Sequence, residues 1–493
     1  MANSKIVEQP EKVPLLEVKN FSLSFRHYET GLRETELEIV RNFNLTIHEG
    51  ETVAVLGASG SGKSLLANAI LGILPSNAKV SGTLKYKGKS LTKKRQSLLR
   101  GREISLIPQS VNALDPLMKT GKQIRPVTKK KADKDIEKDI FEKLGLPASV
   151  GQRYPFELSG GMARRILVSS AIVSSADLII ADEPTPGLDP AVLEETVRQM
   201  KQFAEGIKGM MFITHDIEAA LKVADKIAVF YKGETIEIAR SEDFSGKGEK
   251  LRHPYTKALW NALPKNDFIS LKDRLSSEQD ENTDMIPEKQ KNNKLELSGI
   301  SYRYPKGEWL FRNLDLTVMP GEILGIYGKS GSGKSTLAQI ISGYKKPSEG
   351  SIRLGGEAIA ENGRNPVQMV WQDSEKTINP RWKIKKTLQE GGPENQELFK
   401  AMGIKKEWMT RWPSELSGGE LQRFCLTRVL MGKVDYLIAD EITTMLDTVT
   451  QAQIWSSLIE LSKEKEIGII AISHDHQLLE RICDRVIQFE DLK

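Results

Sequence analysis

The chain has 493 residues, of which 39% are hydrophobic and 28% charged, and its formal net charge is +5. Because ordinary domains hold about 100 to 200 residues, this length predicts two or three domains, each with enough apolar residues for a core. The mildly basic charge fits a solvated exterior. Only Cys425 and Cys483 occur, which excludes a disulfide framework, a cysteine-rich zinc site and a four-cysteine iron–sulfur cluster, and favours a reducing cytosol.

No stretch of the sequence has the pattern of a targeting or membrane-spanning segment. Residues 1–12 lack the apolar core of a signal peptide. The longest apolar runs, such as residues 178–181 and 469–472, have the length of strands, whereas a membrane helix needs about 20 apolar residues. We therefore expect any membrane role to depend on partner proteins.

The sequence GASGSGKS at residues 57–64 fits the phosphate-binding pattern G-x-x-x-x-G-K-[ST]. Its glycines let the backbone turn so that several N–H groups point at one phosphate. The lysine adds positive charge for the β- and γ-phosphates, and the final hydroxyl suits Mg²⁺. An apolar strand at residues 52–56 precedes the loop, and an apolar helix follows it. The candidate ATP-binding residues are Gly57, Ser59, Gly60, Gly62, Lys63 and Ser64.

The same pattern recurs as GKSGSGKS at residues 328–335, which makes the sequence an internal repeat. Other motifs are repeated in the same order, so two copies of one domain lie on the chain. They are Pro108-Gln109 with Trp371-Gln372, LSGG at 158–161 with 416–419, LIIADE ending at Glu183 with LIADE ending at Glu441, and THD at 214–216 with SHD at 473–475. The candidate ATP-binding residues of the second loop are Gly328, Ser330, Gly331, Gly333, Lys334 and Ser335.

Composition separates the two copies. Residues 276–294 contain many charges and almost no large apolar side chains, which predicts a flexible linker. We therefore expect a disordered N-terminus at 1–14, a first domain at 15–265, a linker at 266–294 and a second domain at 295–493.

The pattern within each copy is typical of an α/β fold. In the first copy a strand at 178–181, an amphipathic helix at 191–203 and a strand at 209–213 follow one another. This alternation predicts a mostly parallel core sheet with helices on its faces. The stretch between Gln109 and Leu158 is richer in charge and helix formers, and we expect it to form a separate helical lobe that carries LSGG.

Together these motifs resemble the nucleotide-binding domains of ATP-binding-cassette (ABC) proteins, and the resemblance covers nearly the whole chain. A phosphate loop is shared by many NTPases, but its combination with LSGG, an Asp-Glu pair and a histidine, twice in this order, is very specific. The resemblance implies two tandem P-loop NTPase domains, each with a mostly parallel core sheet, an antiparallel β subdomain and a helical lobe. It also implies hydrolysis of ATP with Mg²⁺ as a cofactor.

The acidic pairs follow apolar strands in both copies. Asp182 and Asp440 end their strands, where a carboxylate can hold Mg²⁺ through water. Glu183 and Glu441 come next, and we expect them to orient and polarise the attacking water; the alternative role is a helix-capping acid. The candidate metal-binding residues are Ser64, Gln109, Asp182, Ser335, Gln372 and Asp440.

The histidines are open to two interpretations. His215 and His474 each follow the next strand, where a lone histidine is more often a satisfied core residue. By their place in the motif order they resemble the switch histidine of the family, which contacts the γ-phosphate. On that interpretation Glu183, His215, Glu441 and His474 are the catalytic residues.

The LSGG segments can expose backbone N–H groups at a positive helix end. In ABC proteins the LSGG of one domain closes over the ATP that the other domain holds. The resemblance therefore implies two composite sites, both expected to hydrolyse ATP. Site one combines Lys63, Ser64, Gln109, Asp182, Glu183 and His215 with Ser417 and Gly419, and site two combines Lys334, Ser335, Gln372, Asp440, Glu441 and His474 with Ser159 and Gly161.

The two copies also depart from the family pattern in different ways. After LSGG the first copy has MARR at 162–165, with Arg164 where glutamine is common, and the second has ELQR at 420–423. After the Asp-Glu pairs Pro184 stands opposite Ile442, and GLD at 187–189 stands opposite MLD at 445–447. These differences make equal turnover at the two sites doubtful.

An aromatic residue is expected to stack on adenine in each copy. Phe25 and Tyr304 stand where the family places it, and Tyr28 is a rival to Phe25. Either side chain could equally belong to a strand core.

Two further segments resemble importers of dipeptides, oligopeptides and nickel: RHPYT at 252–256 with Ala258-Leu259, and the stretches ALDP at 113–116 and INPR at 378–381. The resemblance implies an energising subunit at the cytoplasmic face of the cell membrane. Its expected partners are two permease subunits and an extracellular solute-binding protein, and no nucleic acid is expected to bind. A fused sugar-importer ATPase and a soluble twin-cassette translation factor acting on the ribosome remain alternatives. On the importer interpretation the permeases and the solute-binding protein, rather than this chain, select the cargo among peptides, nickel and metal chelates.

Overall fold

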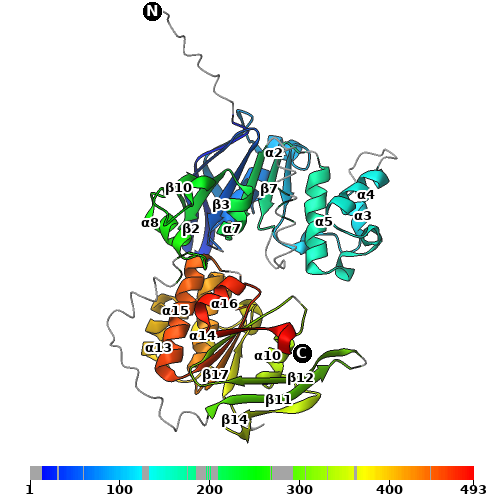
Figure 1. The fold of residues 1–493 in the computed structure, drawn as a ribbon. Helices are drawn as coiled ribbons and strands as arrows, with labels where there is room; N and C mark the ends of the chain where they lie inside the picture. The colour runs from blue at the N-terminus through cyan, green and yellow to red at the C-terminus, as the bar shows by residue number, and fades with distance from the viewer. Residues whose placement is uncertain are drawn as a thin grey trace, which may run out of the picture. The chain divides into compact units, whose positions relative to one another are not determined.

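The computed structural model describes residues 14–29, 33–58, 60–124, 133–174, 176–184, 196, 198, 200, 209–266, 268, 293–305, 307–329, 331–359, 363–444 and 446–492. The chain divides into two compact units, Met1–Trp260 and Asn261–Lys493 (Figure 1). Ser59 and Ser330 lie outside the described residues, as do the segment 1–13, nearly all of the expected linker and most of the expected helix at 191–203.

The core of the first unit is a six-stranded sheet of order β10-β9-β3-β8-β7-β6. Its strands pair in parallel except β10, which runs antiparallel to β9. All residues of β7 and β8 are buried, which explains why they are continuous apolar runs rather than alternating ones. The bounds are β3 Glu51–Gly57, β6 Ile104–Ile107, β7 Leu178–Asp182, β8 Gly209–Thr214, β9 Lys226–Tyr231 and β10 Glu234–Arg240.

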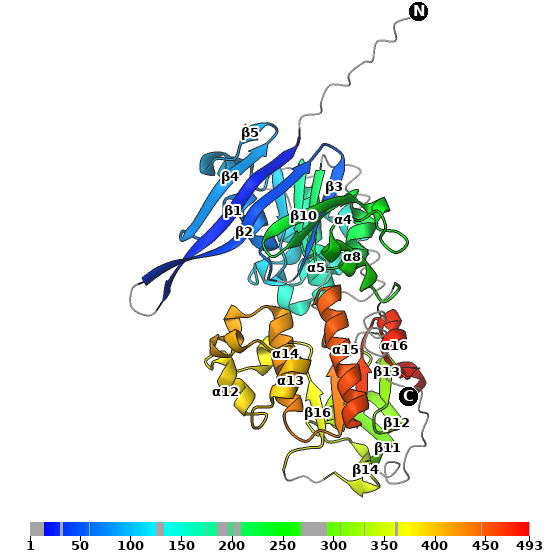
Figure 2. The same cartoon turned by 90° about the vertical axis from the view of Figure 1, so that its left-hand side faces the viewer.

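A four-stranded antiparallel sheet of order β2-β1-β4-β5 covers this core. Leu16 and Phe43 of this sheet share one apolar cluster with Val53 and Ile180 of the core sheet and Ile70 of α1. Figure 2 shows β1 and β2 as a long hairpin. The bounds are β1 Leu16–Glu29, β2 Arg33–Ile47, β4 Ala78–Tyr86 and β5 Lys89–Ser90.

The helices of the first unit fall into two groups. One group packs around the sheets: α1 Lys63–Leu71, α2 Lys93–Leu99, α7 Ile217–Val223 and α8 Pro254–Asn261. The other forms a lobe beside the β6 edge of the core sheet in Figure 1: α3 Thr120–Ile124, α4 Asp133–Lys143 and α5 Gly160–Val173.

The RHPYT segment leads into α8 and is anchored to the first unit. The Tyr255 ring stacks on Tyr231 of β9 at 3.8 Å between centroids. The Trp260 Nε1–H donates to the carbonyl of Gly246 at 2.9 Å. This segment is therefore an integral, packed part of the first unit.

The second unit repeats this plan with a five-stranded parallel sheet of order β16-β17-β18-β13-β19 and an antiparallel sheet of order β12-β11-β14-β15. The parallel strands are β13 Ile323–Tyr327, β16 Val367–Val370, β17 Tyr436–Asp440, β18 Gly468–Ile472 and β19 Arg485–Gln488. The antiparallel strands are β11 Leu295–Arg303, β12 Trp309–Val318, β14 Glu349–Leu354 and β15 Glu357–Ala358.

A buried tyrosine joins the two sheets of the second unit. The Tyr436 hydroxyl, at the start of β17, is 2.9 Å from the carbonyl of Val318 and 3.0 Å from that of Asn293. It also accepts the N–H of Leu295 at 3.2 Å. One side chain of the core sheet therefore fixes the start of β11 and the last residue of β12.

The helices of the second unit are also grouped. A lobe contains α11 Ser374–Thr377, α12 Ile384–Gln389, α13 Gln396–Ala401 and α14 Gly418–Leu430, and its apolar residues share one cluster with the core sheet. The others are α10 Lys334–Ile341, α15 Thr448–Lys465 and α16 His476–Ile482. The predicted α/β fold, with a parallel core sheet, an antiparallel sheet and a helical lobe in each copy, is confirmed. In the part of the chain that the structure describes, no helix has the length and apolarity to cross a membrane.

Candidate functional site

The first phosphate loop joins the end of β3 to the start of α1. A Cβ at Gly57 would lie 2.4 Å from the carbonyl oxygen of Phe230, so only glycine fits there. Gly60 and Gly62 have φ angles of 74° and 102°, in the region that favours glycine. Glycine is thus required at the first position by a close contact, and at the other two positions by a positive φ angle of the backbone.

Lys63 is buried in this loop with only 4% of its surface exposed. Its Nζ donates to the carbonyls of Gly57 at 2.8 Å and Ala58 at 2.6 Å, and lies 3.9 Å from Oε1 of Glu183. These contacts hold the ammonium at the loop, where an incoming phosphate can replace the carbonyls as its partner.

The second loop has the same geometry. Lys334 donates to the carbonyls of Gly328 at 2.7 Å and Lys329 at 2.8 Å. Gly331 and Gly333 have φ angles of 78° and 115°. Burial lowers the pKa of Lys334 below its usual range, an effect that the charge of a bound phosphate would oppose.

The aspartates stand where their strands end. The Ser64 hydroxyl donates to Oδ1 of Asp182 at 3.0 Å. Burial raises the pKa of Asp182 and of Asp440 to about 6 in each case. Oδ1 of Asp440 is buried and has no hydrogen-bond partner among the described residues. An unsatisfied buried carboxylate oxygen fits a cation, so these residue pairs suit Mg²⁺.

Glu183 and Glu441 have an unusual backbone. Their φ angles are 44° and 50°, in the left-handed region that non-glycine residues rarely adopt. The N–H of Glu183 donates to the carbonyl of Ile213, and that of Glu441 to the carbonyl of Ile472, both at 2.9 Å. The neighbouring strand therefore holds each glutamate in a strained conformation, which is a feature of functional sites.

A glutamine and a histidine meet each glutamate. In the first unit Gln109 Nε2 donates to Oε2 of Glu183 at 3.0 Å, and His215 Nδ1 lies 3.3 Å from Oε1. In the second unit Gln372 Nε2 donates to Oε2 of Glu441 at 2.9 Å.

His474 Nδ1 lies 3.5 Å from Oε1 of Glu441. Each unit thus brings together three side chains that are far apart in the sequence, as the motif order predicts.

The electrostatics keep both glutamates ionised. Burial acts to raise the pKa of Glu183, but His215 and Lys63 outweigh it and the pKa falls below its usual value. The same balance lowers the pKa of Glu441 beside His474. Contact with the glutamates raises the pKa of both histidines, against the effect of burial.

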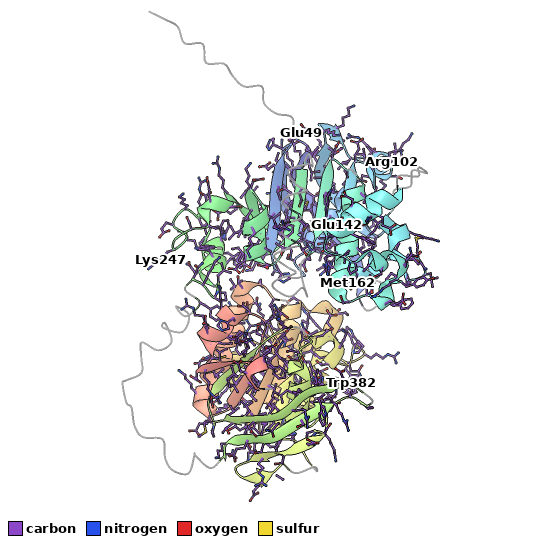
Figure 3. All side chains as sticks on the ribbon, turned by 45° about the vertical axis from the view of Figure 1, so that its right-hand side comes forward. Glu49, Arg102, Glu142, Met162, Lys247 and Trp382 are labelled. Carbon is purple, nitrogen blue, oxygen red and sulfur yellow. The ribbon has the colours of Figure 1, made fainter. Side chains whose placement is uncertain are left out.

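The LSGG segments lie at the starts of the long lobe helices. Ser417 caps α14: its hydroxyl accepts the N–H of Glu420 at 3.3 Å, and the Glu420 carboxylate accepts the N–H of Ser417 at 2.9 Å. The Ser159 hydroxyl accepts the N–H of Met162 at 3.3 Å, and Met162 is labelled in Figure 3. Gly161 and Gly419 lie in the first turns of α5 and α14. The pairing of each LSGG with the other unit stays a prediction.

The two candidate adenine-stacking residues differ in exposure. Tyr304 is 46% exposed, and its hydroxyl lies 3.2 Å from the hydroxyl of Thr336, which follows Ser335. Phe25 is half-buried and packs against the apolar core of the first unit. The side chain of Tyr28 lies outside the described residues. Tyr304 is therefore better placed than Phe25 for a base, and both assignments stay predictions.

Two features were not expected. A cleft of about 960 Å³ in the second unit runs from Ser335, Gln372 and Asp440 to Thr377 and Arg428 of the helical lobe. In the first unit the Arg164 side chain reaches the backbone of Pro108 and Gln109. The departure of residue 164 from the common glutamine was the only signal of this contact in the sequence.

Comparison with known proteins agrees with this geometry. A family model described as ABC transporter matches residues 40–186 and again residues 311–444. The chain therefore belongs to the ABC transporter family, and it is an ATP-binding ATPase with two cassettes.

Curated relatives match almost the whole chain. It is 30% identical to the uncharacterized ABC transporter ATP-binding protein YejF of Escherichia coli, over 96% of this chain and 93% of the relative. It is 28% identical to the glutathione import ATP-binding protein GsiA of Salmonella typhimurium, over 96% of this chain and 84% of the relative.

Solved structures share the fold. RNase-L inhibitor has a TM-score of 0.61 at 20% identity, with 95% of this chain and 87% of that chain covered. The archaeal ribosome recycling factor aABCE1, solved with the ribosomal stalk protein aP1, has a TM-score of 0.59 at 19% identity, with 94% and 87% covered. At such identities the likeness shows the fold alone.

Proposed function

We propose that this chain is the ATP-hydrolysing subunit of an importer that carries short peptides, with nickel or a metal chelate as the other candidate cargo. The observation that carries the ATP-hydrolysing role is the cluster of glutamine, glutamate and histidine beside the phosphate loop in both units. The relative GsiA, named for glutathione import, supports the peptide class, because glutathione is itself a short peptide.

The first step is to bind ATP. Lys63 and Lys334 neutralise the β- and γ-phosphates, while the N–H groups of the glycine loops surround them. Ser64 with Asp182, and Ser335 with Asp440, would hold Mg²⁺ together with Gln109 and Gln372. Mg²⁺, when bound, balances negative charge on the phosphates.

The second step is to position water. Glu183 is ionised and its two carboxylate oxygens face Gln109 and His215. It can accept a hydrogen bond from water and polarise it towards the γ-phosphate, while His215 contacts that phosphate. Glu441 and His474 have the same roles in the second unit. Catalysis of this kind depends mainly on positioning and charge.

We further propose that the two units pair head to tail. The N–H groups at the start of α5 and of α14 then bind the γ-phosphate of the ATP on the other unit, through Ser159 and Gly161 or through Ser417 and Gly419. Both units lie on one chain, so the pairing is intramolecular and its effective concentration is high. Hydrolysis removes the bridging phosphate and releases the pair.

The partners that fit this function are two permease subunits and an external solute-binding protein. The cleft beside Gln372 in the second unit is lined by the exposed ring of Tyr344 and by charged residues such as Lys376 and Glu390. An amphipathic cytoplasmic helix of a permease fits such a mixed surface. The chain would then lie at the cytoplasmic face of the cell membrane.

Two single variants test the ATPase part of this proposal. In Glu183→Gln and in Glu441→Gln the carboxylate that polarises water is lost, so each variant should lose about half or more of the steady-state ATPase rate and still bind ATP. An unchanged rate in either variant would refute two hydrolytic sites.

Co-purification tests the transport part. We expect the full chain to co-purify from membranes with two multi-span proteins. Co-sedimentation with ribosomes instead would favour a translation factor.

A further inference from the structure

Arg164 is a buried cation in the first unit. It lies on α5, the helix that follows LSGG, and only 8% of its surface is exposed. Its Nη1 donates to the carbonyl of Pro108 at 3.2 Å and also to the carbonyl of Gln109. Both carbonyls belong to the loop that follows β6 and carries the glutamine of the site. A single guanidinium therefore joins α5 to this loop.

The second unit has a different residue at the corresponding position. Gln422 stands on α14 where Arg164 stands on α5, and it is 2% exposed. Its Nε2 has no hydrogen-bond partner among the described residues. Gln422 therefore does not donate to the loop that carries Gln372 in this structure. Of the two glutamine loops, only the first receives a hydrogen bond from this position of the LSGG helix.

The arginine is also placed beside the acidic pair. Burial lowers the pKa of Arg164, and the charges of Glu183 and Asp182 counteract that effect. A buried cation is unfavourable unless it is hydrogen-bonded and lies near negative charge. Arg164 has both, because it donates to two backbone carbonyls and is influenced by the charges of Glu183 and Asp182. Since the second unit folds with an uncharged residue at this place, the charge is not a requirement of the fold.

We propose that Arg164 is a positioning residue that ties the LSGG helix of the first unit to the glutamine loop of the same unit. The connection runs from α5 through the guanidinium to the backbone of Gln109, whose side chain contacts Glu183 at 3.0 Å. A displacement of α5 then moves Gln109 relative to Glu183. In the second unit α14 reaches the corresponding loop further along, where Arg428 Nη1 donates to the carbonyl of Thr377 at 3.1 Å, so the two glutamine loops are linked to their lobes through different residues. The roles of LSGG and Gln109 in this inference rest on the proposed function.

Arg165 provides a matched control. It is the next residue of α5, and its Nη1 donates to the carbonyls of Leu144 and Gly145, both at 3.1 Å. Its Nε also donates to the carbonyl of Gly161 at 3.4 Å, so Arg165→Gln removes an arginine of the same helix that donates to three backbone carbonyls, all of them in the helical lobe. Arg164→Gln introduces the residue that the second unit already uses at this place.

Hydrogen exchange of the full chain without nucleotide tests the tie directly. Amides of the first glutamine loop are protected by bonds within the loop, such as Leu114 N–H to the carbonyl of Val111. We expect Arg164→Gln to speed exchange at residues 109–114 about tenfold and to leave residues 372–378 unchanged. Arg164→Lys should restore part of the protection, and Arg165→Gln should match the wild type at 109–114. Unchanged exchange at 109–114 in Arg164→Gln, or an equal rise in Arg165→Gln, overturns the inference.

Kinetics provide a readout that a purely structural role would not give. With site two silenced by Glu441→Gln, we expect Arg164→Gln to lower kcat about tenfold while KM for ATP stays within about twofold. Arg165→Gln should keep both values. A rise in KM with unchanged kcat overturns the inference. If the Glu441→Gln chain shows no ATPase activity at all, independent hydrolysis at site one is refuted, and the exchange experiment still decides the tie.

Discussion

At the scale of single residues, the two glutamates share a strained backbone conformation that non-glycine residues rarely adopt. Glu183 and Glu441 both adopt a left-handed backbone, although a glycine would adopt it without strain. Each is held by a hydrogen bond to the next strand, and each side chain then meets a glutamine and a histidine. The repetition of this strained residue in both units indicates that the orientation of the carboxylate matters more than local stability.

The loop lysines give the first prediction at this scale. Lys63→Ala and Lys334→Ala each remove the ammonium from one phosphate loop, so each should weaken ATP binding at its own site by about tenfold or more. Titration with a fluorescent ATP analogue measures this, and we also expect transport to fall in both variants. Lys329→Ala is the control, because Lys329 is exposed in the same loop and contributes its carbonyl rather than its charge. Unimpaired transport in Lys63→Ala would contradict coupled sites.

At the scale of elements, the N-caps of two helices fix the positions of the histidines that precede them. Asp216 follows His215 and caps α7: its Oδ1 accepts the N–H groups of Glu218 at 2.8 Å and Ala219 at 3.1 Å. Asp475 caps α16 in the same way after His474. The cap fixes where each helix begins, and so fixes the turn that carries the histidine.

Loss of the first cap is therefore expected to affect stability and activity together. Asp216→Ala should lower the free energy of unfolding of the first unit by about 1 kcal/mol. Asp216→Asn should retain most of the stability that the cap contributes, because asparagine is also a good N-cap residue. Denaturant unfolding measures both variants, and the ATPase rate should follow the same order. Equal stability of Asp216→Ala and the wild type would show that the cap contributes nothing.

The elements also show what the sequence could predict. Apolar runs located β3, β7 and β8 to within one residue, because a fully buried strand is continuous in the sequence. The phosphate loops, the acidic pairs and the histidines followed from motifs. The long β1–β2 hairpin, with its register shifts, and the antiparallel β10 were not predicted. Irregular pairing leaves no clear alternation, and the contact of Arg164 with Pro108 joins residues whose proximity arises only from the tertiary fold.

At the scale of the whole molecule, the chain is two similar units with unequal details. Arg164 donates to the backbone of Gln109 in the first unit, whereas in the second unit Arg428 donates to the backbone of Thr377 and a cleft lies beside the site. Both units keep the residues that suit Mg²⁺ and phosphate. Binding should therefore stabilise both units, whereas their rates of hydrolysis can differ.

Thermal unfolding tests binding in both units at once. ATP with Mg²⁺ at about 100 times its dissociation constant should raise Tm by about 5 to 10 °C, since ligand binding to the folded state stabilises it. Removal of Mg²⁺ with EDTA should reduce this shift, because Asp182 and Asp440 then face the phosphates without a counter-ion. An identical shift with and without EDTA would contradict a role for Mg²⁺ at these aspartates.

The buried hydroxyl of Tyr436 has a consequence for how the two sheets of the second unit are held relative to each other. The antiparallel sheet ends next to Tyr304, the residue proposed for the base, and the core sheet carries the phosphate loop and Glu441. Tyr436 locks these two sheets together at the start of β11. It thereby fixes one end of β11, the strand that Tyr304 follows, relative to the core sheet that carries the phosphate loop.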